Sequence, residues 1–140
     1  MNHQPPTTNE GWPQPALPYS QDMPFTNTTT LEELRQAAEQ FATERDWEQF
    51  HSPRNLLLAL VAEVGEACEV VRWLGDGGER IPAEKQQDWA DELADILILL
   101  IRLADRSGVD LPAAFTRKLA IAAARYPAEQ FRGSARKYNE

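Results

Sequence analysis

Apolar residues recur every three or four positions through most of the chain after about residue 30, which is the spacing of amphipathic helices. A first helix is predicted over 31–46, after a capping box formed by Thr30 and Glu33. A second is predicted to run from Pro53, which suits the first helical position, to about Leu74. No alternation typical of strands interrupts the pattern, so the chain is expected to be all-α.

Two further helices are expected toward the C-terminus. The third is predicted over 82–106, with Gly108 just beyond its end. The fourth opens at 110–112 and is stopped by Pro127, because proline disfavours helical geometry in the residue before it. Together the four segments make up one helical domain, and a chain of 140 residues has no room for a second ordinary one.

The second and third predicted helices are apolar on nearly every side, which is typical of helices in the middle of an assembly. Their apolar residues are Leu56, Leu57, Leu58, Leu60, Val61, Val64, Val70, Val71 and Leu74, then Leu93, Ile96, Leu97, Ile98, Leu99, Leu100, Ile101 and Leu103. Four helices from one chain cannot cover both. The expected fold is therefore a four-helix bundle completed by oligomerisation, with a second copy burying the remaining apolar surface.

Residues 1–28 hold six of the ten prolines among Thr, Asn, Gln and Ser, and are predicted to form a flexible leader. The predicted helical domain covers 29–127, and 128–140 is a C-terminal tail.

Composition narrows the partners. A net charge of -8 argues against sequence-independent binding of nucleic acid, which needs a basic surface. No apolar stretch approaches the roughly 20 residues that span a bilayer, so no membrane partner is expected. The single cysteine, Cys68, rules out an internal disulfide and favours a reducing, cytoplasmic location. An acidic protein that binds phosphates needs a metal ion or a local basic cluster.

Two acidic pairs stand within the apolar helices, Glu63 with Glu66 and Glu92 with Asp95. Each pair has the i,i+3 spacing that puts both side chains on one helix face, and no cation lies three or four residues away. A buried carboxylate without a partner is costly, and a hard divalent ion would remove the repulsion among four of them. Mg²⁺, or alternatively Mn²⁺, suits an all-carboxylate site. The other interpretation is that these acids lie on a solvated face.

Several sequence motifs together resemble the MazG-like superfamily of all-α nucleoside triphosphate pyrophosphatases, and within it the dCTP pyrophosphatases. They are FATERDWEQFH over 41–51, PRNL over 53–56, EVGE over 63–66, DELAD over 91–95, RYP over 125–127 and RGSARKY over 132–138. The resemblance covers about 30–139.

The resemblance implies cleavage of a (deoxy)pyrimidine triphosphate, dCTP or a modified dCTP, to monophosphate and pyrophosphate. It also implies a homo-oligomer, a dimer or a dimer of dimers. Glu63, Glu66, Glu92 and Asp95 would be the metal ligands and catalytic residues. Trp47 and Trp73 would flank the base. His51, Arg54 and Asn55 either hold phosphates or cap the second helix. The predicted binders of the triphosphate are Lys118, Arg125, Lys137 and Tyr138, so the C-terminal tail would contribute to the nucleotide site.

The chain departs from this family at Ala122, where an asparagine is usual, at Leu99, where close relatives often carry tyrosine, and at Ala38, where some carry histidine. These departures leave open a nucleotide-binding sensor, or a weakened homologue that binds without efficient cleavage. A purely structural helical module and an enzyme with dUTP or broad specificity also stay open.

Overall fold

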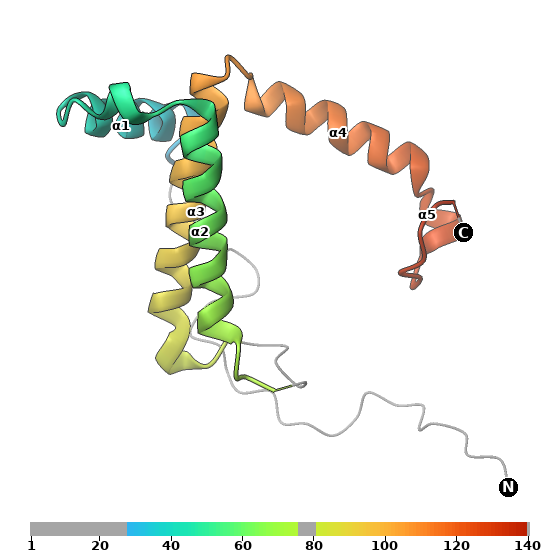
Figure 1. Cartoon of the computed structure of the whole chain (residues 1–140). Coiled ribbons are helices and arrows are strands. Elements are labelled where there is room, and N and C mark those ends of the chain that lie inside the picture. Colours follow the sequence, from blue (N-terminus) through green and yellow to red (C-terminus); the bar gives the residue numbers. More distant parts are fainter. Residues whose placement is uncertain (1–27, 76–80, 140) are drawn as a thin grey trace, which may run out of the picture.

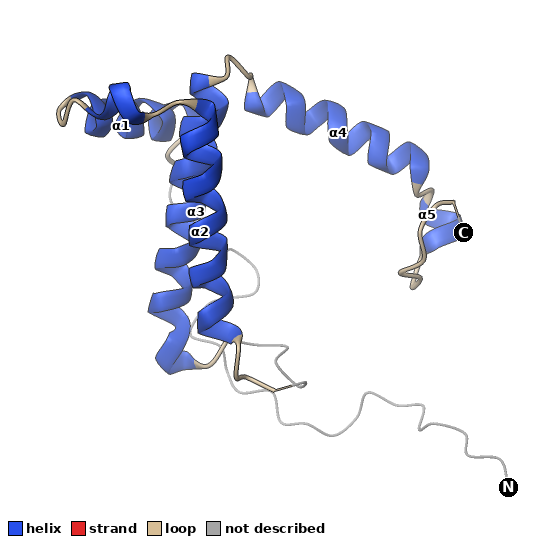
Figure 2. Ribbon diagram, viewed as in Figure 1, coloured by secondary structure: helices blue, strands red, loops and turns tan. Residues whose placement is uncertain are grey.

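The computed structural model describes residues 28–75 and 81–139, and within these residues every regular element is helical (Figure 2). The prediction of an all-α protein is confirmed. The elements are α1 (Leu31–Thr43), η1 (Trp47–Phe50), α2 (Pro53–Val71), η2 (Ala83–Lys85), α3 (Gln86–Arg106), α4 (Leu111–Arg125) and α5 (Ala128–Phe131), where η marks a short 3₁₀ helix. None of the described helices combines the length and the hydropathy needed to cross a membrane. The proline-rich segment lies outside the described residues, apart from Thr28.

The capping box predicted for α1 is present, since the Glu33 N–H donates to Thr30 Oγ1 at 3.2 Å and the Thr30 N–H donates to Glu33 Oε2 at 2.6 Å. The helix ends at Thr43 and not at residue 46 as predicted. The reason is Asp46, whose φ of 54° lies in the left-handed region and turns the chain into η1. This turn brings Trp47 onto a separate short element.

Helices α2 and α4 start in the same way, with a polar N-cap followed by a proline in the first turn. The Asn55 N–H donates to Ser52 Oγ at 3.2 Å, and the Ala113 N–H donates to Asp110 Oδ1 at 3.0 Å. The C-terminal end of α2 receives a different partner, because Lys85 Nζ donates to the Val70 carbonyl at 2.9 Å.

Helices α2 and α3 form an antiparallel pair, and α1 crosses it at the end where α2 begins and α3 finishes (Figure 1). Helix α4 leaves the same end and extends away from the pair, carrying α5 and the C-terminal tail at its far end (Figure 1). There the tail folds back, with the Tyr126 ring centroid 5.1 Å from Phe131 and 5.7 Å from Tyr138.

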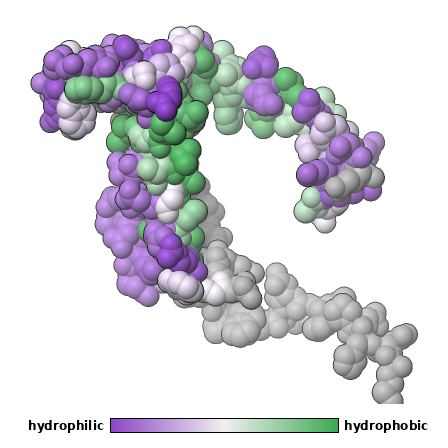
Figure 3. Space-filling view, in the orientation of Figure 1, coloured by the Kyte–Doolittle hydropathy of each residue, from purple (hydrophilic) through white to green (hydrophobic). Residues whose placement is uncertain are grey.

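The buried apolar core is small and lies mainly where α1, α2 and α3 meet. Its members are Ala42, Leu56, Ala67, Ile101 and Ala104. Many large apolar side chains stay exposed, and they include Leu57, Leu58, Val61 and Val64 on α2, Leu93, Leu97, Ile98 and Leu100 on α3, and Phe115 and Leu119 on α4. Figure 3 shows apolar residues continuing from the α2–α3 pair onto the first part of α4. One chain therefore leaves its two most apolar helices partly uncovered.

Candidate active site

Three of the four predicted acidic residues converge between α2 and α3. Glu63, Glu92 and Asp95 each place one carboxylate oxygen so that all three atoms lie within 4.8 Å of one another. Glu63 comes from the middle of α2, and the other two lie three residues apart on α3, so the antiparallel pairing of the two helices creates the cluster. Glu63 and Glu92 are half-buried, whereas Asp95 is exposed.

The electrostatics of this cluster favour uptake of positive charge. Burial raises the pKa of Glu63, and the nearby charges of Glu66, Asp95 and Glu92 raise it further. Burial likewise raises the pKa of Glu92, followed by the effects of Glu66 and Asp95. Glu63 and Glu92 therefore cost more to ionise here than in water, because burial and neighbouring negative charges disfavour their charged forms.

Glu92 provides the clearest test of whether a metal ion fits. Its Oε2 atom is buried and has no hydrogen-bond partner within the described part of the chain. A buried carboxylate oxygen normally has a partner, and two further carboxylate oxygens lie beside this one. An all-oxygen donor set of this kind fits Mg²⁺ or Mn²⁺, which prefer carboxylate ligands, and does not match the His and Cys ligands usual for zinc.

Glu66 is not part of this group of three, although it was predicted to be a ligand. It is exposed, one turn further along α2, and its charge contributes to the raised pKa of both Glu63 and Glu92. Glu66 is therefore a neighbour of the cluster. Its carboxylate oxygens are not within 4.8 Å of the oxygens of all three clustered residues.

Trp47 and His51 lie together at the start of α2. The Trp47 ring meets Phe41 edge-on with centroids 5.7 Å apart, and its centroid is 6.4 Å from that of His51. Trp47 is 44 % exposed, so part of its side chain is accessible to a ligand. Burial, followed by the charge of Arg102, lowers the pKa of His51, which keeps the imidazole neutral near pH 7.

The other residues predicted at the start of α2 divide between two roles. Ser52 caps the helix, and Asn55 Nδ2 donates to the Phe50 carbonyl at 3.0 Å, so the Asn55 side chain joins η1 to α2. Arg54 is exposed and its side chain has no hydrogen-bond or ion-pair partner among residues 28–75 and 81–139. Of the three predicted phosphate or capping residues, Arg54 is the one whose side chain is available to a ligand.

The remaining predicted binding residues are not brought near the acidic cluster within one chain. Trp73 follows the far end of α2 and is 83 % exposed, with Arg72 over its ring at 5.9 Å. Lys118 and Arg125 are on α4, which points away from the α2–α3 pair (Figure 1). Tyr138 packs at the tip of that arm, 5.2 Å below the Arg125 guanidinium, and Lys137 precedes it.

An antiparallel helix pair with a carboxylate cluster between its members describes an all-α protein with a candidate cation site. Comparison with known proteins identifies the class: residues 58–140 match the model of the MazG-like family, and the chain belongs to this family. It is 50 % identical to human dCTP pyrophosphatase 1 over 119 residues, which is 83 % of this chain and 70 % of the human protein. It is 48 % identical to the mouse protein of the same name over the same shares.

A solved structure supports the same assignment. The crystal structure of a pyrophosphatase from Archaeoglobus fulgidus superimposes with a TM-score of 0.66 at 28 % sequence identity, covering 74 % of this chain and 97 % of that one. The resemblance seen in the sequence motifs is confirmed, and the protein is a hydrolase of the dCTP pyrophosphatase type.

Proposed function

We propose that the protein hydrolyses a (deoxy)pyrimidine triphosphate, dCTP or a modified dCTP, to the monophosphate and pyrophosphate. The observation that carries this proposal is the convergence of Glu63, Glu92 and Asp95 with a buried, unpartnered oxygen on Glu92. The similarity to proteins named dCTP pyrophosphatase supports the choice of nucleotide.

Mg²⁺, or Mn²⁺ in its place, would be held by Glu63, Glu92 and Asp95, with Glu66 as a fourth ligand after a change of rotamer. When bound, the ion supplies charge neutralisation at the phosphoryl oxygens and lowers the pKa of a water molecule. The chain's own carboxylates would bind and orient the ion, and Glu63 would also orient the attacking water.

Nucleotide recognition in this proposal uses the exposed aromatic faces and the basic arm. Trp47 and Trp73 stack on the base, because aromatic faces bind flat heterocycles. Between 111 and 139 there are six Lys and Arg residues and one Glu, whereas the whole chain has a net charge of -8. Lys118, Arg125, Lys137 and Tyr138 are the members of this arm that we assign to the triphosphate.

The site requires a second copy of the chain. The arm points away from its own acidic cluster (Figure 1), and a groove of about 610 Å³, lined by apolar residues such as Leu97, Leu100 and Phe115, lies open between α3 and α4. Insertion of helices from another copy would cover this groove and bring the basic C-terminal residues toward a partner's carboxylates, since apolar burial is the main driving force of such association. We propose a dimer or a dimer of dimers.

The test is incubation with each deoxynucleoside triphosphate and Mg²⁺, followed by ion-exchange separation of the products. Formation of dCMP and pyrophosphate from dCTP, abolished by EDTA and by Asp95→Ala, is the expected result. Release of orthophosphate and a diphosphate would contradict cleavage at the α-phosphorus. Tight binding without products would favour a nucleotide sensor, for which the replacement of the usual asparagine by Ala122 is the motivating feature.

A further inference from the structure

A network of charged side chains joins η1 to the C-terminal part of α3. Glu48 on η1 accepts a hydrogen bond from Arg102 Nη2 at 2.5 Å and another from Arg106 Nη1 at 2.8 Å. Arg106 Nε also donates to the His51 carbonyl at 3.0 Å, just beyond the end of η1. Two guanidinium groups from α3 therefore hold the Glu48 carboxylate of η1 and the carbonyl of the residue that follows it, His51.

Arg102 is the centre of this network. Its side chain is 2 % exposed, and it is the one buried charged residue in the described part of the chain. Its Nη1 donates to Asp105 Oδ2 at 2.7 Å, so two carboxylates neutralise the buried guanidinium. A buried charge is tolerated only with such partners, and loss of either partner leaves the other uncompensated. The geometry of the Arg102–Glu48 contact is therefore strongly constrained.

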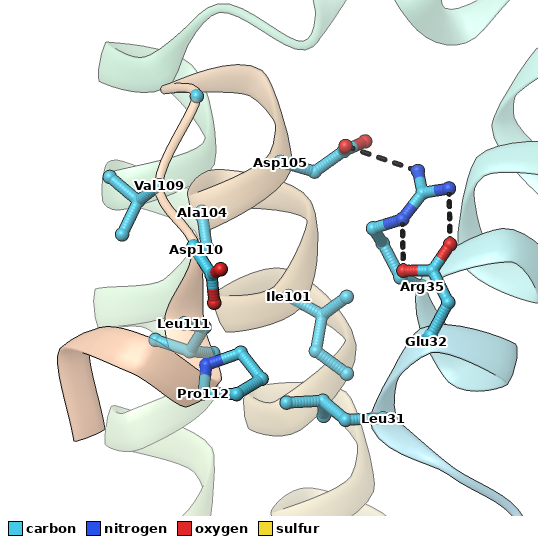
Figure 4. A pocket seen from close by; sticks show the side chains of 11 residues that line it. Leu31, Glu32, Arg35, Ile101, Ala104, Asp105, Val109, Asp110, Leu111 and Pro112 are labelled. Carbon is cyan, nitrogen blue, oxygen red and sulfur yellow. Dashed lines mark hydrogen bonds and ion pairs between the residues drawn. The ribbon is translucent and has the colours of Figure 1, made fainter. Parts of the chain in front are cut away.

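The network also reaches α1 through a separate branch. Arg35 Nη1 donates to Asp105 Oδ1 at 3.1 Å and also contacts Glu32 and Glu39 of its own helix. Figure 4 shows Arg35 between Glu32 and Asp105 at the rim of a cavity of about 530 Å³ that also borders Ile101 and Leu111. This branch fastens α1 to α3 and shares Asp105 with Arg102, but it does not include Glu48. A variant at Arg35 is therefore a control for general loosening of the network with the Glu48 contacts kept.

Trp47 immediately precedes Glu48 on η1, and this short element is held by contacts with the helices around it. It is four residues long, and its N-cap Asp46 makes no capping hydrogen bond from its side chain. Short 3₁₀ segments have poor hydrogen-bond geometry and depend on their surroundings. The side-chain contacts from α3 to Glu48 act together with the Asn55–Phe50 and Gln49–Asp46 hydrogen bonds to fix the element that carries the exposed indole.

We propose that Arg102 is a positioning residue for nucleotide binding: through Glu48 it holds η1 so that Trp47 presents its face to the base. This inference rests on the proposed function. Arg102 lies seven residues beyond Asp95 on α3, about 10 Å along the helix axis, so it is remote from the metal ligands. Its loss should therefore weaken binding of the base and leave the chemical step unchanged.

The kinetic test compares Arg102→Met, which keeps the length and apolar stem, with Arg102→Lys and with Arg35→Met as the matched control. With dCTP and saturating Mg²⁺, Arg102→Met should raise KM about five- to tenfold and leave kcat within about twofold. This rise in KM lies at the lower end of the effect of losing one base–aromatic stack. Arg102→Lys should be intermediate, because an ammonium cannot serve Glu48 and Asp105 as a planar fork does. Arg35→Met should lower Tm without changing KM.

A second variant covers the case in which Arg102→Met does not fold. Glu48→Gln keeps the shape of the side chain and removes its charge, and should raise KM in the same direction. Combining it with Arg102→Lys should add little to the larger single effect, because the two residues act as a pair. An unchanged KM in folded Glu48→Gln and Arg102→Lys, or an equal KM rise in Arg35→Met, would overturn the proposal.

A spectroscopic measurement separates failure of this inference from failure of the proposed function. In protein labelled with 5-fluorotryptophan, the Trp47 ¹⁹F resonance is assigned by its absence in Trp47→Phe. It should shift or broaden in Arg102→Lys and in Glu48→Gln, whereas the Trp73 resonance stays in place. If the wild-type protein cleaves no nucleotide, the proposed function fails and the KM assignment with it. A Trp47 resonance that does not respond contradicts the positioning role even in an active enzyme.

Discussion

Trp47 and Trp73 lie beyond opposite ends of α2, a 19-residue helix that is about 28 Å long. Both are exposed aromatic side chains, and both were predicted to flank the nucleotide base. Stacking requires ring centroids within about 7 Å of the partner ring, so these two tryptophans of a single chain cannot hold one base between them. If both contact the same base, they come from different copies of the chain.

A complementation experiment tests this arrangement. Trp47→Ala and Trp73→Ala should each reduce kcat/KM for dCTP by roughly 5- to 100-fold, which is the cost of losing one stacked ring. When the two variants are co-expressed with different tags and mix freely, half of the dimers are hybrids and one site in each hybrid regains both rings. Activity should therefore recover to about a quarter of the wild-type value, as two-fold symmetry dictates.

The control is co-expression of two differently tagged copies of Trp47→Ala, which should show no recovery. A hybrid preparation no more active than the mean of the two separate variants would exclude a base site shared between copies.

The raised pKa of Glu92 leads to a prediction about stability and pH. Because the carboxyl is harder to ionise in the folded state, its penalty on folding is absent below the ordinary value of 4.5 and grows as pH rises through the folded pKa. In EDTA, Glu92→Gln should therefore have a higher Tm than the wild type at pH 8, and the difference should vanish near pH 4. Differential scanning fluorimetry across this range measures the difference.

Mg²⁺ should reverse the order of the two Tm values. The ion stabilises the wild type by binding the folded state, and it should raise the Tm of Glu92→Gln by less. The kcat of Glu92→Gln should fall by roughly 100-fold or more, since even changes around metal ligands cost 10- to 100-fold. Glu69→Gln is the matched control, because Glu69 is exposed on α2 and paired with Arg72. If Glu69→Gln raised Tm in EDTA as much as Glu92→Gln, the effect would reflect net charge and not the cluster.

The sequence allowed the fold class and most helix starts to be predicted, because these depend on local features. Apolar spacing, the Thr30–Glu33 capping box and the prolines after Ser52 and Asp110 are all present as expected. The end of α1 could not be predicted, because it depends on the left-handed conformation of Asp46. Aspartate adopts this conformation only occasionally, so its presence in the sequence does not indicate it.

The candidate site was predictable only in part, for a different reason. Motif spacing identified the acids, but whether Glu66 joins Glu63 depends on a rotamer that the spacing does not determine. The contact of Glu48 with Arg102 joins positions 54 residues apart, and no local pattern indicates it. Glu48 belongs to the motif FATERDWEQFH over 41–51, and Arg102 stands alone among Leu and Ile residues. This lone arginine in an apolar run was the one sequence feature that could have indicated a buried charge in need of a partner.

Ala122 provides a prediction about substrate affinity. It is exposed on α4, at the position where the resemblance to the family leads us to expect an asparagine. In Ala122→Asn the amide can supply a hydrogen bond to the nucleotide, so KM for dCTP should fall roughly two- to tenfold, which corresponds to about 0.5–1.5 kcal/mol for one net hydrogen bond. Ala123→Asn, on another face of the same helix, should leave KM unchanged. Equal KM values in all three proteins would show that the departure has no effect on binding.

The open apolar surface of α4 predicts how the assembly can be broken. Phe115 is 67 % exposed and lines the groove between α3 and α4. If a second copy fills this groove, Phe115→Asp places a charge in an apolar interface, where burial costs several kcal/mol. The variant should elute and scatter light as a smaller species than the wild type and lose dCTP hydrolysis, with its helical circular dichroism largely retained. Arg117→Asp introduces the same residue about 200° around the helix and should leave the molecular mass unchanged. A Phe115→Asp protein with wild-type mass and activity would mean that no partner occupies the groove, and the composite site would have to be assembled through a different face.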